Sequence, residues 1–324
     1  MLARMRRRVR LLLVGMDVFT RADLMAKGLS PKMILRLVEQ ATLVRVSRGF
    51  YQFTATDEDL AEVIHLARAE VCRGAVLALE SAALVHGLPL LRAVPDLVEV
   101  IEDGDGRSWR RGLRQIRSAP LPEDQVTLVD GSRLTTRART VVDLTRLRGL
   151  EAGLVSWEAA RWQARLAGDL EAFDVAATRA VDLLGRRTGI TRARRALECA
   201  SAWSQSPMET RSLVAISALA LPTPVQQFEV RNERNEVLGI ADFAWPELGV
   251  LGEYDGEGKY LELAHRDESP MEVLRREKRR QESMEADGWV FARWGKQEVA
   301  RPRLLYGRIV SAFSIAQARR GRPA

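Results

Sequence analysis

The chain has 324 residues, of which 46% are hydrophobic, and this length and composition are typical of a globular protein with two or three domains. No apolar run approaches the roughly 20 residues of a membrane-spanning helix, and the run from Leu11 to Val14 is too short for a signal peptide. The two cysteines, Cys72 and Cys199, cannot form a disulfide framework. We therefore expect a cytoplasmic protein without a membrane partner.

The net charge of +7 lies in the first 54 residues, which hold 11 Lys and Arg against 3 Asp and Glu. Residues 55–205 hold 21 against 22, and residues 206–324 hold 18 against 18. A small domain with such an excess of positive charge is expected to bind nucleic-acid phosphates. The alternative is that these residues only keep the domain soluble.

Two short helices are predicted near the N-terminus. Thr20 and Asp23 form a capping box that opens the first helix, which we expect to end at Gly28. Ser30 then caps a second helix with Pro31 at its first position. Apolar residues at helical spacing form the buried face of this second helix: Met33, Ile34, Leu37, Val38 and Ala41. The opposite face carries Lys32, Arg36 and Gln40, a division that a DNA-recognition helix requires.

A β-hairpin follows, with one strand from Leu43 to Val46 and another from Phe50 to Phe53. Arg45, in the first strand, and Arg48, in the turn, make this hairpin basic. Two helices followed by a basic hairpin predict a winged helix. The predicted DNA-binding residues are Lys32, Arg36, Gln40, Arg45 and Arg48. A winged helix that contacts another protein is the alternative.

The runs VFTRADLMAKGLS and LVRVSRGFY, and the spacing between them, resemble the N-terminal winged-helix domain of AbiEi-type antitoxins. The resemblance covers about residues 9 to 54 and implies binding to double-stranded DNA in a bacterial cytoplasm. The resemblance does not itself imply a toxin partner, but we expect a toxin or a second copy of the chain as a further partner.

The middle region, residues 55–205, is predicted to be mixed α/β with a helical second half. Helical patterns at 58–72 and 75–87 precede strand-like runs at 97–101, 113–116 and 126–129, and helices follow from Thr135. His86 and Asp143 are polar residues of the kind used in catalysis, but we expect both to be structural.

From Ser206 onward the pattern predicts a helix, three strands, a helix, a strand and a final helix. If the strands Val237 to Trp245 and Leu248 to Asp255 form a hairpin that closes over Pro246 to Gly249, Asp242 lies directly opposite Glu253. Facing carboxylates repel each other, and Asp255 adds a third acid on the same face. We therefore predict that Asp242, Glu253 and Asp255 bind Mg²⁺ or Mn²⁺.

The alternative is that an arginine such as Arg280 neutralises the pair. The helix expected from Met271 to Asp287 places Val273, Glu277, Arg280 and Met284 on one stripe. Two charged residues thus interrupt the face that packs on the sheet. They need partners, which the acidic residues on the facing strands can supply.

Five sequence segments make residues 206–300 similar to the Vsr-like branch of the PD-(D/E)XK nuclease superfamily: SPMETR, GIADFAW, GEYDGEGKY, EKRRQ and DGWVFARW. The resemblance implies a restriction-endonuclease-like fold and phosphodiester hydrolysis. It assigns Asp242 and Glu253 as metal-binding acids, Glu209 as the acid of the first helix, and Glu277 and Arg280 as polar groups of the following helix.

Local capping of its own helix is the alternative role of Glu209. The chain departs from the superfamily motif where a lysine is expected, because Glu253-Tyr254-Asp255 replaces Glu-X-Lys. We expect Lys259 to take this role in catalysis, with Lys278 as its rival.

These patterns together predict a multidomain α+β and α/β protein. It has a winged helix at 1–54, a mixed α/β domain at 55–205 and a restriction-endonuclease-like domain at 206–324. The expected function is DNA binding coupled to metal-dependent endonuclease chemistry in defence or repair. The alternative is a non-catalytic transcriptional regulator of the antitoxin type, and an RNA-directed nuclease is a third reading.

Overall fold

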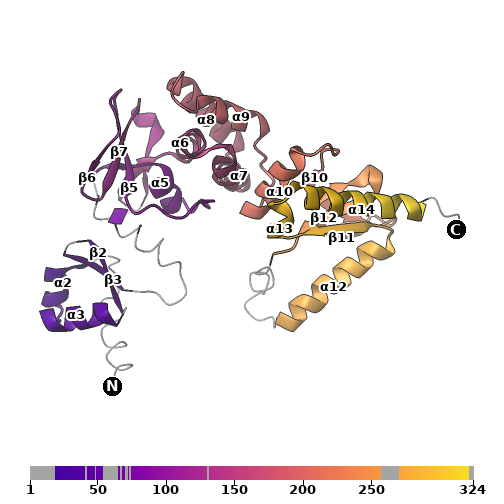
Figure 1. The fold of residues 1–324 in the computed structure, drawn as a ribbon, viewed down its shortest axis with the longest axis horizontal. Coiled ribbons are helices and arrows are strands. Elements are labelled where there is room, and N and C mark those ends of the chain that lie inside the picture. Colours follow the sequence, from indigo (N-terminus) through magenta and orange to yellow (C-terminus); the bar gives the residue numbers. More distant parts are fainter. Residues whose placement is uncertain are drawn as a thin grey trace. The chain divides into compact units, whose positions relative to one another are not determined.

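The computed structural model describes residues 19–40, 42–47, 49–53, 65, 68–69, 72, 74–129, 131–256 and 270–320. The chain divides into two compact units, one of residues 1–160 and 167–200, the other of residues 161–166 and 201–324 (Figure 1). No helix in the described ranges is long and apolar enough to cross a membrane.

The first described elements form a three-stranded sheet with two helices. In spatial order the strands are β1 (Phe19–Thr20), β3 (Phe50–Phe53) and β2 (Leu43–Ser47). The helices are α2 (Arg21–Ala26) and α3 (Pro31–Glu39). The predicted hairpin is confirmed, whereas β1, which pairs antiparallel with β3, was not predicted. Helix α2 ends two residues before Gly28, whose φ of 88° lies in the left-handed region.

A small hydrophobic core holds these elements together. Its central side chains are Leu24, Ile34, Leu37 and Leu43, each at most 2% exposed. Met33 and Val38 pack against this core from α3, as the helical spacing predicts. The segment therefore buries one face of α3 and leaves the other in solvent.

The middle region contains a six-stranded mixed sheet. Its strands, in spatial order, are β6 (Trp109–Arg111), β7 (Arg114–Ser118), β5 (Val98–Glu102), β4 (Val76–Leu77), β9 (Ser132–Thr135) and β8 (Val126–Val129). The predicted strands β5, β7 and β8 are present. The helix predicted at 75–87 is shorter, because β4 occupies its first turn and α5 (Leu79–Val85) follows. The pattern expected at 58–72 lies largely outside the described residues.

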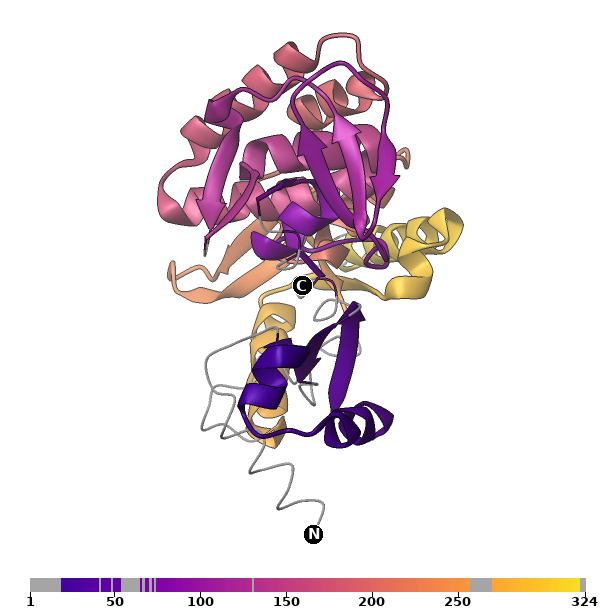
Figure 2. The same ribbon diagram turned by 90° about the vertical axis from the view of Figure 1, so that its left-hand side faces the viewer.

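Four helices follow this sheet: α6 (Arg137–Arg148), α7 (Leu150–Ala167), α8 (Leu170–Leu184) and α9 (Ile190–Cys199). Helices α6, α8 and α9 pack against one another and lie on one side of the sheet (Figures 1 and 2). Asp143 of α6 is 2% exposed and accepts hydrogen bonds from Arg139 at 2.7 Å and Arg146 at 3.0 Å. A ring nitrogen of His86 lies 2.8 Å from the carbonyl of Thr135. Both residues have the structural roles expected for them.

The second unit follows the predicted order of a helix, three strands, a helix and a strand, and it then has two terminal helices where one was predicted. Its elements are α10 (Pro207–Ser217), β10 (Val225–Arg231), β11 (Val237–Trp245), β12 (Val250–Tyr254), α12 (Pro270–Ala286), β13 (Val290–Trp294), α13 (Lys296–Val299) and α14 (Pro302–Arg320). The sheet order is β10-β11-β12-β13, with β13 parallel to β12 and the other pairs antiparallel. Strand β12 begins later than predicted because Pro246–Leu248 forms a short 3-10 helix.

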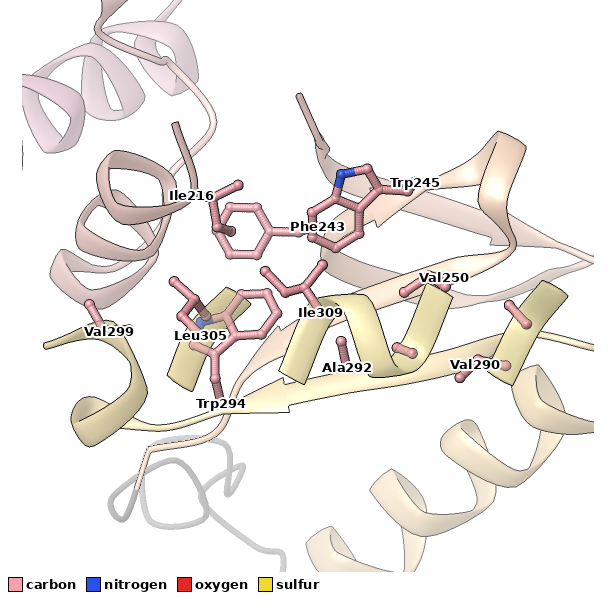
Figure 3. Close-up of a cluster of buried hydrophobic side chains, with 12 residues drawn as sticks. Ile216, Phe243, Trp245, Val250, Val290, Ala292, Trp294, Val299, Leu305 and Ile309 are labelled. Carbon is pink, nitrogen blue, oxygen red and sulfur yellow. The ribbon is translucent and has the colours of Figure 1, made fainter. Parts of the chain in front are cut away.

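Helices α12 and α14 cover opposite faces of this sheet. Phe243, Trp245 and Val250 belong to one buried cluster with Ile216 of α10 and with Leu305 and Ile309 of α14 (Figure 3). The alternate residues of the strands, Ala244 and Leu251, pack with Met284 of α12. Because Asp242 and Glu253 share the face of Ala244 and Leu251, both lie on the side that α12 covers.

Candidate functional site

The outward face of α3 is the first candidate site. The hydroxyl of Ser30 accepts a hydrogen bond from the backbone N–H of Met33 at 3.3 Å, which fixes the start of the helix. Lys32 and Arg36 are exposed, opposite the buried Ile34 and Leu37. These two cations therefore lie on the exposed side of α3, and the opposite side of this helix packs into the core.

Helix α2 is fixed by the predicted capping box. The Thr20 hydroxyl and backbone N–H both donate to Oδ2 of Asp23, at 2.7 and 2.8 Å. The backbone N–H of Asp23 donates in return to the Thr20 hydroxyl at 3.1 Å. The side-chain hydrogen bond from Thr20, followed by the backbone one, lowers the pKa of Asp23 below its usual 3.8. The cap thus remains charged and intact at neutral pH.

The other predicted DNA-binding residues divide into three cases. Arg45 of β2 is exposed, as expected. Gln40 is only half-buried rather than fully exposed, and within the described part of the chain its Oε1 is buried without a hydrogen-bond partner. Gln40 is the C-cap residue of α3, directly after the last helical residue Glu39. Arg48 lies outside the described residues.

The hairpin of β11 and β12 is the second candidate site. Its antiparallel register pairs Phe243 with Gly252 and Trp245 with Val250, which is the predicted register. The next step in that register brings Asp242 opposite Glu253. Oδ2 of Asp242 accepts a hydrogen bond from the backbone N–H of Tyr254 at 3.1 Å. The prediction that these two acids face each other is consistent with this contact.

Glu253 is held by two arginines rather than left to repel Asp242. Nη2 of Arg280 lies 2.7 Å from Oε1 of Glu253, and Nη2 of Arg293 lies 3.0 Å from Oε2. Glu253 is 6% exposed, and Arg293 is its partner in the parallel register of β12 and β13. Both carboxylate oxygens therefore have cationic donors, as the alternative with Arg280 predicts.

A glycine makes room for the Arg280 side chain. A Cβ on Gly239 would lie 2.9 Å from Cδ of Arg280 and 2.4 Å from Cε of Met284. Arg280 also donates from Nη1 to the carbonyl of Ile240 at 2.9 Å. The side chain of Arg280 thus packs against β11 at Gly239, and its guanidinium bonds both the Ile240 carbonyl and Glu253.

The remaining predicted site residues have other surroundings. Asp255 is exposed and follows the last residue of β12, and its backbone N–H donates to the carbonyl of Trp294 at 2.9 Å. Glu209 is 8% exposed and serves its own helix start: it accepts from the backbone N–H of Gln205 at 2.8 Å and from Nε2 of Gln227 at 3.0 Å. Lys278 is exposed, 3.8 Å from Glu282. Lys259 and the side chain of Glu277 lie outside the described part of the structure.

The described residues give no support to a divalent-cation site. None of them forms a group of three or more His, Cys, Asp or Glu side chains that could share a metal ion. Glu253, the acid best placed to be a ligand, already has both oxygens in ion pairs with arginines. Mg²⁺ and Mn²⁺ binding by Asp242, Glu253 and Asp255 therefore stays a prediction.

Comparisons with known proteins find a match for the first segment. Residues 2–54 match the family model described as "Transcriptional regulator, AbiEi antitoxin". The crystal structure of the RV2827C protein from Mycobacterium tuberculosis matches with a TM-score of 0.35 and 17% identity, covering 70% of this chain and 87% of that chain. No curated protein sequence matches. The family match ends at residue 54 and does not reach the segment predicted to resemble Vsr-like endonucleases.

Proposed function

We propose that this chain is a DNA-binding transcriptional regulator of the AbiEi antitoxin type. The observation that carries the proposal is the exposed position of Lys32 and Arg36 on the solvent face of α3, within the segment that matches the antitoxin family. An α-helix fits the major groove of duplex DNA, and a cationic face is attracted to the phosphates on either side. Arg45 adds a cation from the hairpin.

In this proposal the second unit has a restriction-endonuclease-like arrangement but no catalytic activity. It acts as a scaffold or as a dimerisation surface. The ion pairs of Glu253 with Arg280 and Arg293 support this role, because they give the buried acid a structural use. A toxin partner or a second copy of the chain is the expected binding partner besides DNA, and the bacterial cytoplasm is the expected compartment.

Binding of the full chain to a mixed-sequence DNA duplex, measured by fluorescence anisotropy at low salt, tests the proposal. Lys32→Gln should weaken binding severalfold because a phosphate contact is lost. Lys296→Gln is the matched control, since Lys296 is also an exposed lysine in the first turn of a helix. Equal affinity of the two variants and the wild type would contradict DNA binding through α3.

Metal-dependent endonuclease activity is the second candidate. The order of elements from α10 to α14 and the register that brings Asp242 toward Glu253 favour it. Incubation of supercoiled plasmid with the protein and Mg²⁺ or Mn²⁺, beside an Asp242→Ala variant, tests it. Nicking by the wild type alone would support the second candidate, and intact plasmid in both reactions would exclude it under those conditions.

A further inference from the structure

Leu35 is an apolar residue in the middle of the cationic face of α3. It is 63% exposed, although Ile34, one residue before it, and Leu37, two residues after it, are 2% and 0% exposed. At helical spacing it shares the solvent face with Lys32, Arg36 and Glu39, all exposed. Leu35 is not part of the small core of this segment, so its side chain is available to a partner.

The charges around Leu35 restrict what can cover it. The face carries two cations, Lys32 and Arg36, against one acid, Glu39, and a second copy of the chain would bring the same net positive charge toward it. A partner that is anionic at its edges and apolar at its centre fits better. The major groove of duplex DNA has this character, because phosphates line both sides and the 5-methyl group of thymine projects into the groove.

We propose that Leu35 is a specificity-determining residue that contacts the 5-methyl group of a thymine in the major groove. The proposal rests on the proposed DNA-binding function and adds a base preference to it. Lys32 and Arg36, three residues before and one after Leu35, hold the phosphates or bases beside that thymine. Contact between Leu35 and the methyl group removes apolar surface from water on both molecules.

The size of the effect follows from the apolar area involved. Burial of one methyl-sized group corresponds to about a three- to fivefold change in affinity. Removal of the thymine methyl should therefore weaken wild-type binding by about this factor at one position of the site. The same removal should have no effect at that position on a variant that lacks the leucine.

The experiment begins with duplexes enriched by the full-length wild-type protein from a random-sequence library. In the best-bound duplex each thymine is replaced in turn by deoxyuridine, which removes the methyl group and leaves the base pair and its O4 acceptor unchanged. Dissociation constants are then measured for the wild type, Leu35→Ala, Leu35→Met and Leu128→Ala. Leu128 is the matched control, because it is 66% exposed and lies on β8, outside the winged-helix segment.

One deoxyuridine position should weaken the wild type, Leu35→Met and Leu128→Ala by a similar factor and leave Leu35→Ala unaffected. Leu35→Met guards against a folding defect, since it keeps an apolar side chain of similar size. If replacement of thymine by deoxyuridine weakens binding by the wild type and by Leu35→Ala equally at every position, the assignment of Leu35 is overturned while DNA binding stands. Absence of binding to any duplex would overturn both proposals.

Discussion

Arg280 of α12 and Glu253 of β12 form an ion pair whose N–O distance is 2.7 Å, with side-chain exposures of 21% and 8%. Arg293 completes the arrangement from the neighbouring strand at 3.0 Å. The acid that the sequence assigned to a metal is thus the common partner of two cations. A metal-binding acid that faces another acid lowers the stability of the protein when no metal is bound. Glu253 is instead expected to raise the stability, through its ion pairs with the two arginines.

Glu253→Gln should destabilise the chain by about 2 kcal/mol, because it leaves two partly buried arginines without their counter-charge. We place the loss below that of a fully buried pair, since Arg293 is 36% exposed. Urea unfolding of the full chain measures it. Asp255→Asn, which neutralises an exposed acid beyond the same strand, should change the free energy of unfolding little. If Glu253→Gln without added metal is as stable as the wild type or more stable, the result would instead favour the prediction that Asp242 and Glu253 repel each other.

Gly252→Ala should destabilise the second unit by about 1 to 3 kcal/mol through overpacking. Its Cβ would lie 2.6 Å from Cη2 of Trp294 and 3.1 Å from Cβ of Phe243. Trp294 cannot easily move away, because it is 2% exposed and its Nε1 donates to the hydroxyl of Ser212 at 2.9 Å.

Gly307→Ala is the matched control for this substitution. Gly307 lies inside α14, and its added Cβ would meet nothing within 4 Å. Alanine should therefore stabilise the helix by up to about 1 kcal/mol. Thermal unfolding of the two variants should show opposite shifts of Tm. A lower Tm for both would mean that the packing around Gly252 is not the cause.

Stability should decrease as the pH falls below neutral, because His65 is buried. Burial, the largest effect, lowers the pKa of His65 below its ordinary value of 6.5. As the pH falls past 6.5, the unfolded chain binds the proton first, so stability is lost between that pH and the lower pKa of the folded state. The loss is complete below the folded pKa.

Urea unfolding at several pH values from about 7.5 downward, with the wild type and His65→Gln, checks this expectation. The variant should show a shallower pH dependence. It should not become flat, since burial also lowers the pKa of His86. Parallel pH profiles of the wild type and His65→Gln would show that His65 does not control the loss.

The sequence predicts best those parts of the fold that depend on local chemistry. The caps at Thr20 and Ser30 and the turn from Pro246 to Gly249 are set by neighbouring residues, and the structure has all three. The register of β11 and β12 followed from that turn. Strands β1 and β4, of two residues each, were missed because so short a strand has no periodicity.

The candidate site was predictable only in part, for a different reason. The stripe containing Arg280 and Met284 showed that α12 brings a charge to the sheet, and the contact with Glu253 confirms it. The role of Arg293 was not foreseen, because it depends on the parallel pairing of β12 with β13, two strands separated by a helix. Long-range pairing of this kind leaves little trace in local sequence.

The dependence of DNA affinity on salt tests the central claim most directly. For the full chain, log K should fall linearly with log salt, and each phosphate contact should contribute about 0.9 to the slope. If Lys32 and Arg36 both contact phosphates, the variant with Lys32→Gln and Arg36→Gln should have a slope smaller by about 1.8. An unchanged slope in this variant would contradict DNA recognition by the exposed face of α3.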